Sequence, residues 1–195
     1  MPRMAERDWI KQGPKIFGYE PGWLWWAAVF VVVCGGLYWG SIQLDRQQKN
    51  RAYLYERASY HANEKDLDSV LVHAVIQAES SWDWQAESSA GAKGLMQVMP
   101  IALEEVKRLE GIDDGDLFDV DYNLHVGTLY LAYLLERFDG DITLAIAAYH
   151  MGPTAVAKGQ RQYPDLSSLD MIEKHGGPQT RAYVKKVLGL IEQAD

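Results

Sequence analysis

The chain has 195 residues, of which 48% are hydrophobic and 24% charged, and its formal net charge at pH 7 is −8. This length suits one globular domain plus an appendage. Residues 45–195 carry fifteen Lys and Arg against twenty-four Asp and Glu, so the acidity belongs to the larger part of the chain. Nucleic acids are bound mainly by neutralising phosphates, and we therefore expect no nucleic-acid partner.

Metal-binding and disulfide patterns are lacking in the sequence. Cys34 is the only cysteine, so no intramolecular disulfide can form. The five histidines show no close ligand pair, and zinc needs convergent nitrogen or sulfur ligands. The acidic tract over 113–121 lacks the ligand spacing of an EF-hand loop. We predict a solvated acidic loop there, no metal site and no cofactor.

Residues 23–42 form a run of twenty without a formal charge, WLWWAAVFVVVCGGLYWGSI. A helix of that length spans about 30 Å, the hydrocarbon thickness of a bilayer. Aromatic residues at both ends are typical of interfacial belts. A buried core helix is the alternative, but such helices rarely run so far uncharged. We predict an uncleaved transmembrane anchor, because the mixed-charge segment before it does not resemble a signal peptide.

The predicted organisation has four parts: a tail over 1–22, the anchor over 23–42, a stalk helix over 43–56 and a globular domain over 57–195. Basic residues flank the anchor on both sides, so the positive-inside rule gives no orientation. Helical periodicity over 45–63 places Tyr53, Leu54, Ala58 and Ala62 near one apolar stripe.

Further helices are predicted over 69–79, 101–109, 122–138 and 142–149, and after Pro178. Asp66 or Asp68, Asp121 and Asp141 are the expected N-caps of three of them. Residues 80–94 read as a loop, as does the Gly-, Pro- and Gln-rich segment after Tyr149. No strand pattern is evident, and we expect an all-α fold.

Glu79 ends a helical run that is apolar almost all round, which predicts a buried helix. Burial disfavours an ionised carboxylate, and the negative end of a helix acts in the same direction. Glu79 is therefore a candidate acid that stays protonated near neutral pH.

Several motifs follow Glu79-Ser80 in a fixed order. They are GAKGLMQVMP over 91–100, Asn123, Gly127-Thr128-Leu129-Tyr130-Leu131, Ala147-Ala148-Tyr149 and Thr180-Arg181-Ala182-Tyr183-Val184. Over residues 57–191 this order resembles the lysozyme-like catalytic domain of soluble lytic transglycosylases of the family-1 type. The resemblance implies an all-α, goose-type lysozyme-like domain behind the predicted anchor.

Members of that family cleave the β-1,4 bond between N-acetylmuramic acid and N-acetylglucosamine in peptidoglycan and leave 1,6-anhydromuramic ends. The resemblance implies that Glu79 is the sole catalytic carboxylate, acting first as acid and then as base. It further implies that Ser88, Gln97, Met99 and Tyr149 bind substrate, with Met99 a flexible apolar wall of the cleft. Asn123, Tyr130 and Tyr183 fit either a groove or a structural role.

The chain departs from the family pattern at two places. The family usually has Tyr-Asn-Ala-Gly where this chain has Tyr149-His150-Met151-Gly152. Trp82 and Trp84 replace the usual Asn-Pro region and could stack on sugars or pack the loop. Asp83 or Glu87, if either entered the cleft, could serve as a second carboxylate.

A lytic transglycosylase is the predicted function. A muramidase acting on the same bond, or a weakly active peptidoglycan-binding module of an envelope machine, are the alternatives. Peptidoglycan lies outside the cytoplasmic membrane. We therefore expect a single-pass bacterial inner-membrane protein with a cytoplasmic N-terminus, a periplasmic domain and an unidentified envelope-complex partner.

Overall fold

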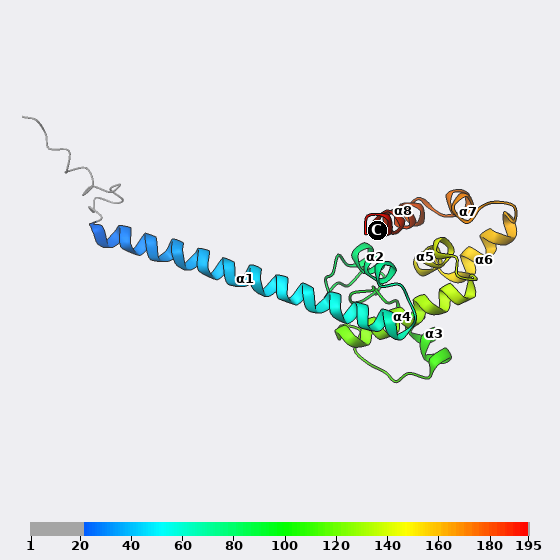
Figure 1. Cartoon of the computed structure of the whole chain (residues 1–195), viewed down its shortest axis with the longest axis horizontal. Helices are drawn as coiled ribbons and strands as arrows, with labels where there is room; N and C mark the ends of the chain where they lie inside the picture. Colours follow the sequence, from blue (N-terminus) through cyan, green and yellow to red (C-terminus); the bar gives the residue numbers. More distant parts are fainter. Residues whose placement is uncertain (1–21, 195) are drawn as a thin grey trace, which may run out of the picture. The chain divides into compact units, whose positions relative to one another are not determined.

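The computed structural model describes residues 22–194, most of which are helical (Figure 1). Eight helices occur in that range. Their bounds are α1 Trp23–Glu64, α2 Ser69–Glu79, α3 Pro100–Glu110, α4 Val120–Arg137, α5 Ile142–Met151, α6 Pro153–Gln162, α7 Ser168–His175 and α8 Pro178–Glu192. Within the same residues, β-type pairing is limited to two isolated bridges, Glu87 with Lys93 and Lys93 with Val98. The predicted all-α class is confirmed.

Two compact units divide the chain, residues 1–50 and residues 51–195, and α1 runs from the first into the second. In the first unit Phe30, Val32 and Leu37 are exposed by 69%, 73% and 71%. No helix in the described part of the chain is both long and apolar enough to cross a bilayer, so the predicted anchor is not confirmed. The side chains at the ends of that predicted span, 23–25 and 42, lie outside the described residues, as does the tail over 1–21.

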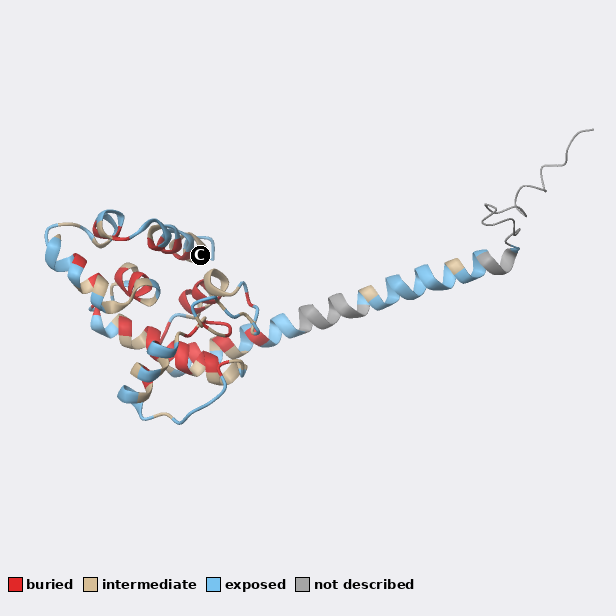
Figure 2. Cartoon of the chain, turned by 180° about the vertical axis from the view of Figure 1, so that it is seen from behind, coloured by how far each residue is buried: buried red, intermediate tan, exposed pale blue. Residues whose placement is uncertain are grey.

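Helix α5 is the centre of the second unit. It contacts α4, α6, α7 and α8, and its residues 144–148 are all buried. The sequence ITLAIAAYHM explains this position, since a helix that is apolar on every side is stable only when surrounded, and its alanines permit close approach. Figure 2 shows the buried residues gathered on α5 and on the facing sides of its neighbours.

Helix α2 is buried as the sequence predicted, and it packs against α8. Asp68 caps α2 by accepting a hydrogen bond from the Val70 N–H at 2.8 Å. Asp141 caps α5 in the same way, accepting from the Leu144 N–H at 2.9 Å. These side chains satisfy helix N–H groups that have no partner within the helix.

Asp121 does not cap α4, and this prediction is wrong. Asp119 caps the helix by accepting from the Tyr122 N–H at 2.8 Å. Asp121 instead accepts a hydrogen bond from Arg57 Nε at 2.6 Å and lies 3.2 Å from His61 Nε2. This contact connects the end of α1 to α4.

The apolar stripe predicted on α1 is confirmed in three of its four positions. Leu54, Ala58 and Ala62 are buried, whereas Tyr53 is exposed.

The segment after Tyr149 is not a loop, because α6 and α7 occupy most of it. Pro153 stands in the first turn of α6, where a missing N–H costs no hydrogen bond. Gly159 lies inside α6 against α7, and a Cβ there would lie 2.6 Å from Met171 Sδ. The proline therefore starts a helix, and the glycine permits close helix packing.

Asn123 of α4 fixes the loop that follows α2. Its buried side chain accepts from the Met96 N–H at 2.9 Å and donates to the Lys93 and Leu117 carbonyls, both at 2.8 Å. Gly94 has a φ of 74°, and a Cβ there would collide with the Asn123 amide. One turn later on α4, a Cβ on Gly127 would collide with the Met96 sulfur.

We expect Asn123→Ala to lower the free energy of unfolding by about 2–4 kcal/mol, because three hydrogen bonds are lost and the Met96 N–H and the Leu117 carbonyl lose the partner that Asn123 provides. Urea denaturation measures the change. Asn63→Ala is the matched control, since its side chain is exposed and a cost below about 0.5 kcal/mol is expected. Equal costs for the two variants would show that Asn123 does not clamp the loop.

Candidate active site

Glu79 is the last residue of α2, and a strained turn follows it. Ser81 and Trp82 have φ values of 54° and 70°, a left-handed conformation that costs residues other than glycine about 1–3 kcal/mol each. Packing holds the turn in place. Trp82 is buried, its ring stacks on Tyr55 with 3.8 Å between centroids, and it meets the His73 ring edge-on at 5.4 Å. Trp82 therefore packs the interior and does not face a ligand.

The Glu79 carboxyl is half-buried, and burial raises its pKa from 4.5 to about 7. Hydrogen bonding by Tyr183 and the charge of Lys186 lower the pKa and only partly offset this effect. Lys186 Nζ also donates to the Ala78 carbonyl at 2.8 Å, which places a cation at the C-terminal end of α2. The negative helix end is thus partly neutralised, and burial is the main cause of the raised pKa.

Tyr183 comes from α8 and is almost fully buried beside Glu79. Burial raises the pKa of the Tyr183 hydroxyl well above its usual value, and the Glu79 charge adds to this, so the phenol stays protonated and can act as a donor. The hydroxyl acts on Glu79 yet has no protein hydrogen bond of ordinary geometry among the described residues. Such loose contacts at a reactive group are common before substrate binds.

Tyr149 of α5 also lies close enough to Glu79 to sense its charge. Burial raises the pKa of its hydroxyl well above the usual value, with the Glu79 charge the next cause. The hydroxyl donates to the Met96 carbonyl at 2.8 Å. Its single proton is therefore already committed, and toward Glu79 the oxygen can only accept. Tyr149 also lines the neighbouring groove.

That groove has a volume of about 310 Å³ and lies among α3, α4, α5 and the residues before α3. It is lined by Gln97, Val98, Met99, Ile101, Ala102, Tyr130, Tyr149, His150, Met151 and Gly152. Three of the four predicted substrate-binding residues, namely Gln97, Met99 and Tyr149, are in this set. Gln97 adopts a φ of 45°, and its amide donates to the Ala86 and Gly94 carbonyls, both at 3.0 Å. Its side-chain oxygen is left as the group able to accept.

Ser88, the fourth predicted substrate-binding residue, is not among those that line the groove. Its hydroxyl oxygen accepts from the Ala92 N–H at 3.0 Å, and its N–H donates to the Ala92 carbonyl at 2.9 Å. The structure therefore shows Ser88 closing a tight turn. A substrate contact by Ser88 stays a prediction.

The two carboxylates considered as partners of Glu79 point elsewhere. Asp83 is exposed and accepts from the Gln85 N–H at 3.0 Å within a local turn. Glu87 is exposed and lies 3.9 Å from Lys93 Nζ. Neither lines the groove, and the described residues that do include no Asp or Glu.

Lys186 is the site residue that the sequence did not single out. It follows Tyr183 by three positions, a spacing that places both on one face of α8. That signal is present in the sequence. The contact between this face and the end of α2 follows from the packing of the two helices, and the spacing of residues along α8 does not predict that packing.

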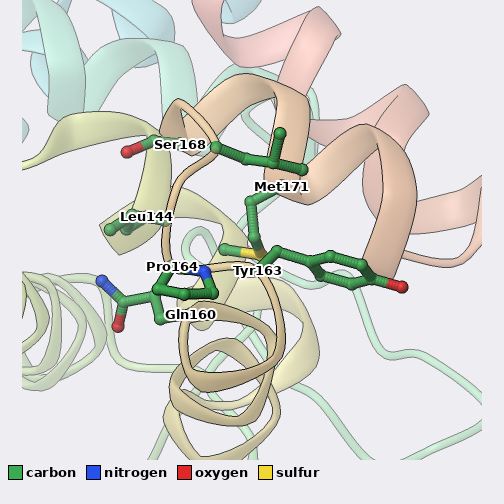
Figure 3. Close-up of a pocket in the computed structure, with 7 residues that line it drawn as sticks. Leu144, Gln160, Tyr163, Pro164, Ser168 and Met171 are labelled. Carbon is green, nitrogen blue, oxygen red and sulfur yellow. The ribbon is translucent and has the colours of Figure 1, made fainter.

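Glu79 lines neither of two further hollows. One of about 320 Å³ is bordered by Tyr55 and residues of α2 and α8. The other, of about 90 Å³, lies between α5, α6 and α7, where Tyr163, Pro164 and Met171 surround it (Figure 3). It is too small for a sugar ring and contains no ionisable carboxyl group.

The fold and the site together define a helical domain in which a half-buried glutamate, Glu79, lies close to Tyr149 of a groove. The Transglycosylase SLT domain family matches residues 57–172, more than half of the chain. The chain belongs to this family.

Curated relatives and solved structures agree with this assignment. The soluble lytic murein transglycosylase of Salmonella typhimurium is 29% identical over 169 residues, covering 84% of this chain and 26% of that protein. The membrane-bound lytic murein transglycosylase F of Desulfosudis oleivorans is 35% identical over 142 residues, covering 69% and 28%. The structure of an inactive Glu-to-Gln mutant of the Pseudomonas aeruginosa lytic transglycosylase Slt has a TM-score of 0.65 at 32% identity, covering 70% and 23%. The chain thus spans about a quarter of the length of these relatives.

The raised pKa of Glu79 makes stability depend on pH. The folded state binds the Glu79 proton more tightly than the unfolded state does, so this stabilisation is complete below pH 4.5 and is lost as pH rises through about 7. We expect Glu79→Gln to match the wild type at pH 4.5 and to exceed its free energy of unfolding by about 3 kcal/mol at pH 8. Urea denaturation at both pH values measures this, with exposed Glu87→Gln as the control that gains nothing. A pH-independent difference would contradict the raised pKa.

Proposed function

We propose that this chain is a peptidoglycan lytic transglycosylase. It cleaves the β-1,4 bond between N-acetylmuramic acid and N-acetylglucosamine and leaves a 1,6-anhydro-N-acetylmuramic end. The observation that carries the proposal is the half-buried Glu79, with a pKa of about 7, close to Tyr149, which lines a groove whose described lining residues include no carboxylate. Family membership and the murein transglycosylases among the relatives support the same activity.

In the proposed mechanism, Glu79 first donates its proton to the glycosidic oxygen as the bond to the muramoyl C1 breaks. The resulting carboxylate then takes the proton of the C6 hydroxyl of the same muramoyl ring, and O6 bonds to C1. Glu79 is protonated again at the end, and no water enters the product. A conventional glycosidase needs a second carboxylate for water or for covalent attack. The internal nucleophile is already close to C1, which removes much of the entropic barrier.

The groove residues have matching proposed roles. Gln97 presents its side-chain oxygen to a sugar N–H or hydroxyl group, because both of its amide hydrogens are used by the backbone. Met99 supplies an adaptable apolar wall. Tyr149 accepts a hydrogen bond beside Glu79, since its own proton is donated to Met96. Ser88 shapes the turn at the start of the motif over 91–100.

We expect Glu79→Gln to lower the rate of sacculus digestion at least 1,000-fold, because the amide neither donates nor accepts the proton that the reaction moves. The relative from Pseudomonas aeruginosa is described as inactive after the same type of replacement. Mass spectrometry of the wild-type products should show anhydro ends, 18 Da lighter than hydrolysed ends by the mass of one water. Glu87→Gln is the matched control and should keep full activity.

Hydrolysed reducing ends without anhydro ends would establish a muramidase in place of a transglycosylase. Full activity of Glu79→Gln would remove Glu79 from the mechanism. Binding of sacculi by both proteins, with digestion by neither, would identify a binding module.

We further propose that residues 23–42 anchor the enzyme in the cytoplasmic membrane with the domain on the periplasmic side, where peptidoglycan lies. The uncharged length of this segment supports the proposal, as do its exposed side chains Phe30, Val32 and Leu37. The relatives include a membrane-bound transglycosylase, although others are named as soluble.

The full chain should therefore stay with membranes through an alkaline carbonate wash. Replacing Val31 and Val33 by Lys should release it, since each charge costs about 2.5–3.5 kcal/mol at the centre of a bilayer. Leu169→Lys is the control, because this residue is exposed on α7, and it should not alter the fractionation. Release of the wild-type chain by carbonate would exclude the anchor.

A further inference from the structure

His150 occupies a position where the family pattern usually has asparagine, and it joins α5 to α8. Its ring lies against that of Tyr183, with 4.7 Å between centroids and 33° between the planes. Its Nδ1 lies 3.2 Å from the Thr180 hydroxyl, one turn before Tyr183 on the same helix. Burial lowers the pKa of His150, so the ring is neutral at pH 7 and can accept the Thr180 proton.

Tyr183 needs such a support. Its hydroxyl is buried beside Glu79 without a hydrogen bond of ordinary geometry, so no fixed polar contact orients it. Orientation must then come from packing on the ring. His150 packs on the Tyr183 ring and is itself held by Thr180, so two contacts from one residue bear on the position of the phenol.

We propose that His150 is a positioning residue that holds the Tyr183 hydroxyl toward Glu79. The inference rests on the proposed function, because it concerns how the acid of that reaction is tuned. His150 acts through Tyr183 and forms part of the groove wall, but it transfers no proton in the reaction.

Loss of the His150 support should raise the pKa of Glu79. The titratable groups that face Glu79 are Tyr183 and Lys186 on α8 and Tyr149 on α5. Donation by Tyr183 stabilises the ionised carboxylate and lowers its pKa. A Tyr183 ring that loses its support donates less well, so the pKa of Glu79 rises further. The alkaline limb of the pH–rate profile, where the acid loses its proton, then moves to higher pH.

Two variants separate the contacts of His150. His150→Asn introduces the usual family residue, which can still reach a hydroxyl but offers no ring to Tyr183. Thr180→Val keeps the imidazole and removes only its hydrogen-bond partner at nearly constant volume. His125→Asn is the matched control, since this histidine lies on α4 and its ring faces His61 at 6.1 Å.

Sacculus digestion by the full chain in detergent, measured between pH 4.5 and 9, gives the alkaline limb for each protein. We expect His150→Asn to move the alkaline limb upward by roughly 0.5–1 pH unit, less than the loss of a whole hydrogen bond to the ionised form would give, because the Tyr183 contact is weakened and not removed. Thr180→Val should move it in the same direction by less, and His125→Asn should not move it.

A second measurement does not need activity. The difference in free energy of unfolding between each protein and its Glu79→Gln derivative changes with pH and becomes constant above the pKa of Glu79 in the folded state. The pH at which this plateau begins therefore reports that pKa. We expect this pH to rise by the same amount, roughly 0.5–1 unit, in the His150→Asn background.

Unchanged limbs and unchanged stability midpoints in both variants would overturn the positioning role, provided that Glu79→Gln is inactive. If Glu79→Gln stays fully active, the proposed function itself is wrong.

Discussion

The arrangement of the domain depends on a carboxyl group held where its charge is poorly solvated. Glu79 ends a helix whose apolar residues are buried, and α8 packs against that helix. The pKa of about 7 corresponds to roughly 3 kcal/mol of lost stability when the group ionises, a large part of the 5–15 kcal/mol that holds a typical domain folded. The buried core of α5 and its neighbours offsets that cost.

Most of the polar contacts of the motif over 91–100 hold its own loop in place against α4 and α5. Gly94 and Gly127 let the loop approach α4 closely enough for Asn123 to bind its backbone at two atoms, the Met96 N–H and the Lys93 carbonyl. The carbonyl of Met96, fixed by that approach, accepts a hydrogen bond from the Tyr149 hydroxyl. Gln97 uses its amide on the same loop. Residues that look like ligand contacts in sequence are thus connected through the backbone into one wall of the groove.

Local signals predicted much of the fold. Helical periodicity and Asp caps located α2 and α5, because both features act within a few residues. The same logic failed at α4, where Asp119 and Asp121 are both plausible caps and only the partner Arg57, distant in sequence, distinguishes them. It failed again at α6, because a proline in a first helical turn and a glycine at a helix contact look like loop residues when their neighbours are unknown.

The site shows the same division. Glu79 could be predicted because burial and helix position are visible along the chain, whereas Lys186 could not, because its effect depends on which helix α8 meets. In the proposed mechanism one carboxylate serves twice, and the opposing effects on the pKa of Glu79 fit this double role. Burial alone would leave an acid too reluctant to ionise to work as a base, and Tyr183 and Lys186 alone would leave a base with no proton to give. A pKa between these limits, close to neutral pH, lets the same oxygen atoms donate a proton in one step and accept one in the next, which is the requirement of a mechanism without a second carboxylate.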